Sequence, residues 1–196
     1  MYGNTEFRIM EKIYLSPGIH KRELSKQLKL GMPSIDYGIR KVDKLLIKKR
    51  SGNQIKYFLD YSKEAITSVI YAIEHNRLDR LPMKIKIAVR DLLKEIKDKP
   101  LIAVIFGSYA KGDYTKESDI DILLVFQKIE NTKELENTAK RISMRTSTEL
   151  NPAYLDYDSF KDSFHDSTKK FFKNLKDDRL FVAGIEWWRQ LEDEEA

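Results

Sequence analysis

Apolar residues recur at helical spacing three times near the start of the chain. The pattern predicts helices from Thr5 to Leu15, from His20 to Leu28 and from Pro33 onward, with breaks at Ser16-Pro17-Gly18 and Gly31. Proline suits the first turn of a helix, because an amide there would have no helical partner. The buried stripe expected on the third helix is Ile35, Ile39, Val42 and Leu46.

Two short segments with alternating apolar residues follow the three helices. Leu46 to Arg50 and Ile55 to Leu59 flank the turn Ser51-Gly52-Asn53. In the second segment every other residue is apolar, as in a strand with one buried face: Ile55, Tyr57 and Leu59. The pattern therefore predicts a two-stranded hairpin.

The rest of the chain alternates helical patterns with short apolar runs. Two runs, Leu101 to Phe106 and Ile122 to Phe126, are continuous and apolar, which is typical of strands buried on both faces. The other elements expected, in chain order, are helices at 62–75, 82–97 and 132–146, a strand at 149–155, a helix at 159–173, a strand at 179–184 and a last helix that carries Trp187 and Trp188.

Composition places the chain among folded globular proteins. Hydrophobic residues make up 41% of it and aromatic residues 11%. The chain has no cysteine, which excludes disulfides and thiolate metal sites. No apolar run is long enough for a membrane span or a signal segment, so we expect a cytoplasmic protein without membrane contact.

Charge is distributed unevenly along the chain. Residues 1–60 carry a net charge of +7, residues 61–100 of +3 and residues 101–196 of −5. A basic N-terminal part is compatible with polyanion binding, and an acidic C-terminal part with divalent cations. We expect two domains, at 1–60 and 99–196, joined by helices at 61–98 that act as a linker or as the interface of a homodimer.

The order helix, helix, helix, hairpin resembles the winged helix-turn-helix family over about 60 residues. In that family the third helix enters the DNA major groove and the hairpin touches the flanking backbone. The resemblance implies a duplex-DNA contact surface made of Ser34, Tyr37, Arg40, Lys41 and Lys44 on the third helix, with Lys48, Lys49, Arg50 and Lys56 on the hairpin. Winged helices also serve as protein-interaction or dimerisation modules, and that alternative stays open.

The motif that carries chemistry lies between the two buried strands. The first strand leads into Gly107-Ser108, whose glycine lets the backbone approach a phosphate and whose serine adds a hydroxyl and an amide donor. After ten residues come Asp119 and Asp121 at the start of the second strand. Residues two apart on a strand share a face, with about 7 Å between their Cα atoms. Two carboxylates held so close favour a hard divalent cation between them, either magnesium or manganese.

Gly-Ser, ten residues and Asp-x-Asp resembles the minimal nucleotidyltransferases of the DNA polymerase β-like superfamily, over roughly residues 99–190. The resemblance implies an α/β (α+β) fold, in which a small mixed sheet is flanked by helices. It also implies that Gly107 and Ser108 bind the triphosphate of ATP or another NTP, and that Asp119 and Asp121 are catalytic and hold the metal ions. Lys111 is expected to contact a phosphate.

The family usually supplies a third carboxylate from a later strand, and here the sequence departs from it. The expected position holds Asn151. Glu149 lies two residues earlier, on the same predicted strand face, and is the expected substitute as catalytic base. Asp156 is a weaker candidate, because it lies at the strand end with the other parity.

These observations predict a magnesium-dependent nucleotidyltransferase that moves NMP from an NTP to a hydroxyl. The acceptor is open: a partner protein, such as the toxin of an antitoxin–toxin pair, is preferred, and a small molecule such as an aminoglycoside is the alternative. A second interpretation is a DNA-binding regulator whose transferase-like domain only binds nucleotide, which Asn151 favours. A third is an antitoxin that acts by binding its partner alone.

Overall fold

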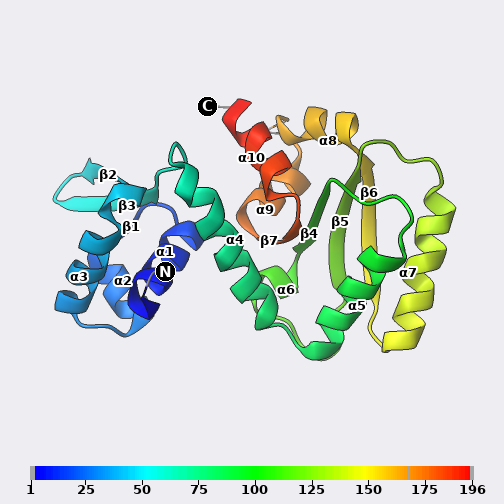
Figure 1. Cartoon of the computed structure of the whole chain (residues 1–196), viewed down its shortest axis with the longest axis horizontal. Coiled ribbons are helices and arrows are strands. Elements are labelled where there is room, and N and C mark those ends of the chain that lie inside the picture. Colours follow the sequence, from blue (N-terminus) through cyan, green and yellow to red (C-terminus); the bar gives the residue numbers. More distant parts are fainter. Residues whose placement is uncertain (1–2, 167, 195–196) are drawn as a thin grey trace. The chain divides into compact units, whose positions relative to one another are not determined.

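The computed structural model describes residues 3–166 and 168–194. It divides into two compact units, an N-terminal unit (residues 1–73) and a C-terminal unit (residues 74–196). The fold is of the mixed α+β class, with helices around two small sheets (Figure 1). Among the described residues, no helix is both long enough and apolar enough to cross a membrane.

The N-terminal unit is built from three helices and a three-stranded antiparallel sheet of order β1-β3-β2. His20 caps α2 by accepting a hydrogen bond from the Glu23 amide at 3.2 Å, and Pro33 stands in the first turn of α3. The elements are α1 (Asn4–Leu15), β1 (Ile19–His20), α2 (Lys21–Leu28), α3 (Met32–Val42), the 3-10 helix η1 (Asp43–Leu45), β2 (Leu46–Ser51) and β3 (Gln54–Leu59).

The core of this unit follows the predicted stripe, with two differences. Ile35, Ile39 and Val42 are buried on α3, and Leu46 is buried too, although it opens β2 rather than continuing the helix. Ile55 was expected to be buried but is 47% exposed, and it lies one residue from the end of the hairpin, where β3 begins. The two-residue strand β1 was not predicted, since two residues show no alternation.

The C-terminal unit holds a four-stranded sheet of order β6-β5-β4-β7, in which β5 and β6 are parallel and the other pairs antiparallel. The division between the units falls inside α4 (Glu64–Asp79). The remaining elements are α5 (Met83–Glu95), β4 (Ile102–Phe106), α6 (Ser108–Lys111), β5 (Ile120–Phe126), α7 (Thr132–Thr146), β6 (Leu150–Asp156), α8 (Tyr157–Phe164), α9 (Lys170–Asp177), β7 (Arg179–Ala183) and α10 (Ile185–Glu194).

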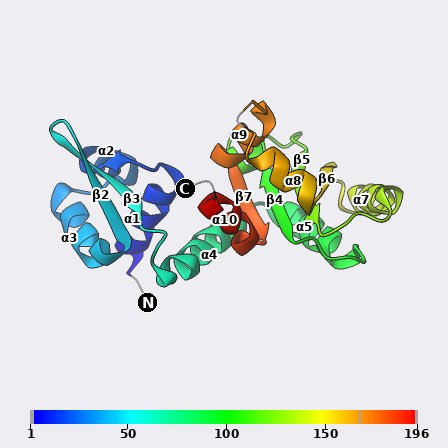
Figure 2. The same cartoon turned by 90° about the horizontal axis from the view of Figure 1, so that it is seen from above.

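Helices cover both faces of this sheet (Figure 2). On one face α5 and α7 bury Ile85, Leu92 and Ile142 against the even-numbered residues of β5. On the other face α8, α9 and α10 gather aromatic rings around the fully buried Trp188. The helix α5 is therefore part of the core of the C-terminal unit, whereas the sequence pattern assigned residues 61–98 to a separate helical linker.

The single helix predicted at 159–173 is wrong, because the chain forms two helices there, α8 and α9. Between them Asp166 accepts hydrogen bonds from the Thr168 amide at 2.9 Å and the Thr168 hydroxyl at 2.6 Å. A short polar side chain that bonds the backbone two residues on stabilises a turn in place of a helix. The local hydrogen bonds outweigh the apolar spacing of the phenylalanines.

The outer edge of β7 is capped by two side chains of α4. The buried carboxylate of Glu74 accepts a hydrogen bond from the Phe181 amide at 2.8 Å. Arg77 donates to the Arg179 carbonyl at 2.8 Å and to the Ala110 carbonyl of α6 at 3.1 Å. Glu74 and Arg77 also pair with each other at 2.8 Å, with side chains 2% and 11% exposed. The pair thus satisfies the strand's polar groups and ties α6 to β7.

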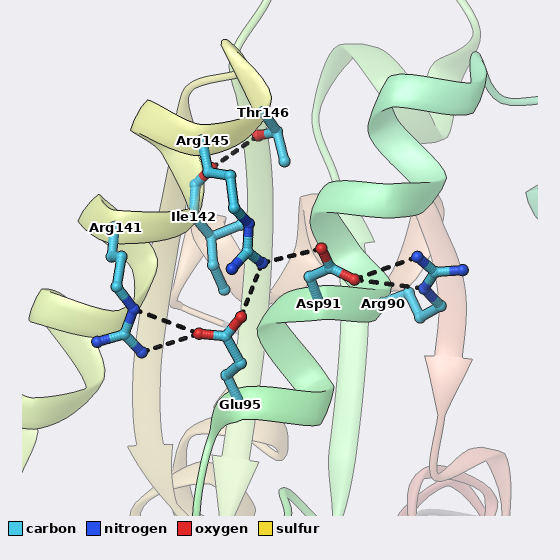
Figure 3. A network of polar contacts seen from close by, with 7 residues as sticks. All are labelled: Arg90, Asp91, Glu95, Arg141, Ile142, Arg145 and Thr146. Carbon is cyan, nitrogen blue, oxygen red and sulfur yellow. Dashed lines mark hydrogen bonds and ion pairs between the residues drawn. The ribbon is translucent and has the colours of Figure 1, made fainter.

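A second set of ion pairs joins α5 to α7 at the surface. Arg145 lies between Asp91 and Glu95, and Arg141 lies beside Glu95 (Figure 3). The nitrogen–oxygen distances are 2.9 Å from Arg145 to Asp91, 2.7 Å from Arg145 to Glu95 and 2.9 Å from Arg141 to Glu95. The guanidinium groups of Arg145 and Arg141 lower the pKa of Glu95 below its ordinary value. Because these side chains are open to water, screening limits what each pair contributes to stability.

We expect Arg77→Met to lower the free energy of unfolding of the C-terminal unit by about 3 kcal/mol, because it leaves a buried carboxylate without its cation. Urea denaturation followed by tryptophan fluorescence measures this, since both tryptophans, Trp187 and Trp188, lie in that unit. The matched control is Arg145→Met, which removes an arginine from the exposed pairs. Equal losses for the two variants would contradict the special role of the buried pair.

Candidate functional site

The four strands of the C-terminal unit bring the predicted site residues to one end of the sheet. Phe106, the last residue of β4, pairs with Asp121 near the start of β5 and with Arg179 at the start of β7. The first residue of β6, Leu150, pairs with Ile120. The end of β4 and the starts of β5, β6 and β7 therefore all lie at the same end of the sheet, and α6 extends from that end.

Gly107 occupies a conformation that the site requires. Its φ of +69° and ψ of −146° lie where residues with a side chain are strained. A Cβ atom on Gly107 would also lie only 2.5 Å from Oδ2 of Asp121. The turn from β4 into α6 can therefore approach the Asp121 carboxylate this closely only if residue 107 is glycine.

The paired carboxylates lie where β5 begins. The strand starts at Ile120, so Asp119 just precedes it and is exposed, whereas Asp121 is half-buried within it. Asn151 donates a hydrogen bond from Nδ2 to Oδ1 of Asp121 at 2.9 Å. The register of the parallel pair β5–β6 places Asn151 directly beside Asp121. An amide thus occupies the neighbouring position, where the family pattern predicts a carboxylate.

Glu149 and Asp156 lie at opposite ends of β6. Glu149 is exposed just before the strand, and its carbonyl accepts a hydrogen bond from the Ile120 amide at 2.8 Å, which places it beside Asp119 in the extended register. Asp156 ends the strand and caps α8 by accepting from the Ser159 amide at 2.9 Å. Hydrogen bonds from the Ser159 amide and hydroxyl lower the pKa of Asp156. Glu149 therefore lies at the site end of the sheet and Asp156 does not.

Two tyrosines and a lysine complete the surroundings of the Gly-Ser turn. Tyr109 is buried, stacks on Tyr114 with ring centroids 4.5 Å apart, and donates from its hydroxyl to the Ser118 carbonyl at 3.3 Å. Burial, and then the electrostatic effects of Tyr114 and Asp119, raise the pKa of Tyr109. Lys111, the predicted phosphate contact, pairs with Asp178 at 3.4 Å at the site end of β7.

The sequence pattern did not predict that Arg77 and Tyr109 hold the segment around the Gly-Ser turn in place. Arg77 reaches α6 from a helix more than 30 residues earlier, and its contacts are with backbone carbonyls, which leave no spacing signal. Tyr109 had a local signal, because it lies beside Ser108 with Tyr114 five residues later. Both residues hold the segment between Gly107 and Asp119 in place rather than reaching into the site.

Comparison with known proteins assigns the segment that contains these residues to a family. A family described as "Nucleotidyltransferase domain" matches residues 82–184, just over half of the chain. The chain belongs to this nucleotidyltransferase family. The matched segment contains Gly107, Asp119, Asp121 and Asn151, whereas Arg77 lies before it.

Several nucleotidyltransferases resemble the chain. "Putative protein adenylyltransferase MJ0141" of Methanocaldococcus jannaschii is 32% identical over 85 residues, which cover 42% of this chain and 85% of the relative. "Putative protein adenylyltransferase MJ0604" of the same organism is 77% identical over 22 residues, 11% of this chain and 22% of the relative. The crystal structure of a "putative nucleotidyltransferase" from Sulfolobus solfataricus is 24% identical and covers 55% of this chain and 84% of its own, with a TM-score of 0.31.

Most of the residues predicted to contact DNA are exposed on α3, η1 and the hairpin of the N-terminal unit. Ser34, Tyr37, Arg40 and Lys41 are exposed on α3. Lys44 is exposed too, but it belongs to η1 rather than to the helix. On the hairpin Lys49 lies over the Phe58 ring at 5.4 Å, and the Arg50 Nε donates to the Gly52 carbonyl at 3.3 Å.

We expect Gly107→Ala to destabilise the C-terminal unit more than Gly112→Ala does. Both glycines have positive φ, +69° and +84°, so each substitution costs about 1 kcal/mol of backbone strain. Only at Gly107 does the new methyl group also meet Asp121, which adds about 1 kcal/mol or more, since nothing lies within 4 Å of a Cβ at Gly112. Urea denaturation of the two variants measures the difference, and equal losses would show that Asp121 is free to move away.

Proposed function

We propose that this protein transfers NMP from an NTP, with ATP as the preferred donor, to a hydroxyl group of an acceptor. The observation that carries the proposal is the close approach of the Gly107-Ser108 turn to Asp121. The turn offers backbone and hydroxyl donors to a triphosphate, while Asp119 and Asp121 offer oxygen ligands beside it. Membership of the nucleotidyltransferase family supports transfer of a nucleotidyl group in general.

The donor set fits magnesium or manganese. Among the described residues no group of three or more His, Asp or Glu side chains is placed to hold a metal ion. Magnesium, however, is commonly held by one or two carboxylates together with water and substrate phosphates. Asp119 and Asp121 would hold it, and the ion would neutralise charge on the phosphates as the transfer proceeds.

The residues of the chain have separate parts in the proposed reaction. The acceptor oxygen attacks the α-phosphorus, the bond from that phosphorus to the bridging oxygen breaks, and pyrophosphate leaves. Glu149 accepts the proton of the acceptor hydroxyl, since it is an exposed carboxylate at this sheet end, next to the residue that pairs with Ile120. Ser108 and Lys111 orient the triphosphate, and Lys111 exchanges Asp178 for a phosphate oxygen.

A protein acceptor is the preferred choice, because both relatives from Methanocaldococcus jannaschii carry the name protein adenylyltransferase. The toxin of an antitoxin–toxin pair is one such acceptor, and a small molecule is the alternative.

In a second candidate function the C-terminal unit binds nucleotide without transfer and the protein acts as a regulator or an antitoxin. Asn151 favours it, since its amide cannot serve as a base.

For the N-terminal unit we propose a winged helix that binds duplex DNA. The exposed basic residues on α3 and the hairpin support this, as does the net charge of +7 over residues 1–60. Helix α3 would enter the major groove, and the hairpin residues Lys49 and Arg50 would contact phosphates. A homodimer would match the two-fold symmetry of many operators.

We expect Asp119→Asn with Asp121→Asn to abolish magnesium-dependent binding of ATP while the fold is kept, because the two ligands of the cation lose their charge. Titration calorimetry with and without magnesium measures it. The matched control is Asp158→Asn with Asp162→Asn, which removes two exposed charges from α8. Equal affinity of wild type and the site variant for Mg-ATP would refute the metal assignment.

Variants at residues 149 and 151 distinguish an active transferase from a regulator that binds nucleotide without transferring it. With labelled ATP in a lysate, Glu149→Gln should lower transfer by about 100-fold with unchanged ATP affinity, a typical effect of losing a general base. Asn151→Asp should then have little effect. The regulator is the correct interpretation if wild type labels nothing and Asn151→Asp restores labelling.

For DNA binding, we expect Arg40→Ala with Lys41→Ala to weaken binding of the full chain to duplex DNA and to flatten its salt dependence, because fewer counterions are released. Electrophoretic shifts between about 50 and 200 mM salt measure both effects. Lys133→Ala with Lys140→Ala, an exposed pair on α7, is the charge-matched control. No shift of any duplex by wild type at about 50 mM salt would sink the proposal, because phosphate contacts are still strong there.

A further inference from the structure

Helix α9 carries an aromatic residue, Phe171, whose ring is only partly buried. Phe172 and Leu175 form its buried side, whereas Phe171 is 40% exposed. The Phe171 ring meets the Phe106 ring edge-on, with centroids 5.3 Å apart. One side of Phe171 thus rests on the end of β4, and a substantial part of the ring faces solvent.

The contact with Phe106 places the Phe171 ring near the candidate site. Phe106 immediately precedes Gly107 and is the strand partner of Asp121. Residues directly opposite in an antiparallel pair have Cα atoms about 4.5–5.5 Å apart and side chains on the same face of the sheet. Phe171 therefore stands one ring away from the carboxylate and from the Gly-Ser turn.

A second exposed aromatic residue of the C-terminal unit, Trp187, serves as a comparison for the position of Phe171. Trp187 is 38% exposed and meets the Tyr157 ring edge-on, with centroids 5.4 Å apart. Tyr157 follows the end of β6, and Trp187 follows the end of β7, so both lie at the sheet end away from the site. The two rings have similar exposure and each meets one other ring edge-on, but of the two only Phe171 lies at the sheet end that holds the carboxylates.

We propose that Phe171 is the stacking surface for the base of the NTP. This inference rests on the proposed function: with the triphosphate at Gly107-Ser108, the base reaches past Phe106 to the exposed ring. Every nucleobase has a flat apolar face, and stacking on an aromatic side chain is largely independent of base identity. Helix α9 also carries the exposed residues Lys170 and Lys173, whose positive charge would attract a polyanionic ligand toward this part of the unit.

The test compares two ligands that share phosphates but differ in the base. Titration calorimetry on the full chain with magnesium gives the dissociation constants of ATP and of inorganic triphosphate. Phe171→Ala should weaken ATP by about tenfold, the scale of one lost stacking contact, and leave triphosphate unchanged. Phe171→Leu, which keeps apolar contact with Phe106 but lacks a flat face, should behave like Phe171→Ala, and Phe171→Trp should retain affinity for ATP. Trp187→Ala is the control and should bind both ligands as wild type does.

The outcomes separate the inference from the function on which it rests. Failure of wild type to bind ATP would overturn the proposed function and the stacking site with it. Wild-type binding together with unchanged affinity in Phe171→Ala would overturn the stacking site alone. Equal weakening of ATP and triphosphate would also overturn it, because the ring would then only shape the phosphate turn.

Discussion

The candidate site depends on the register of β5 with its two neighbours. The strand pairs residue by residue with β4 on one side and with β6 on the other, so its position is specified twice. Since side chains alternate along a strand, a slip of one residue would turn Asp121 to the opposite face and bring an isoleucine beside Gly107. The continuous apolar runs in β4 and β5 favour pairing of these strands, and the two neighbours together fix the register.

Once the register is set, both oxygens of Asp121 have defined neighbours. Asn151 donates to Oδ1, and Oδ2 occupies the space that a Cβ atom at Gly107 would need. A carboxylate held in this way does not have to be reoriented when a charged ligand arrives, which is the property that preorganised sites share. The hydrogen bond from Asn151 also shows the effect of an amide at the position where the family pattern predicts a carboxylate. Residue 151 donates a hydrogen bond to Asp121 instead of adding a further negative charge.

The sequence predicted those parts of the fold that depend on local pattern. The buried strands, the order of elements and the fold class could be predicted because apolar runs and helical spacing are local signals. The Gly-Ser and Asp-x-Asp motif named the residues of the candidate site, and the fold brings Gly107 and Asp121 together at one end of the sheet. The break between α8 and α9 was missed, because a side chain bond from Asp166 overrides the spacing of the phenylalanines. The bond between Asn151 and Asp121 joins residues 30 positions apart and requires the strand order, which no local pattern supplies.

The capping of β7 by Glu74 and Arg77 indicates that the C-terminal unit begins within α4. Both residues precede the segment that matches the nucleotidyltransferase family, which starts at residue 82. A fragment cut at that boundary would leave the amide of Phe181 and the carbonyl of Arg179 facing water on a bare outer strand. Unprotected strands of this kind recruit further strands, from a second copy or from a passing extended peptide. The last turns of α4 therefore keep the sheet at four strands and the unit self-contained.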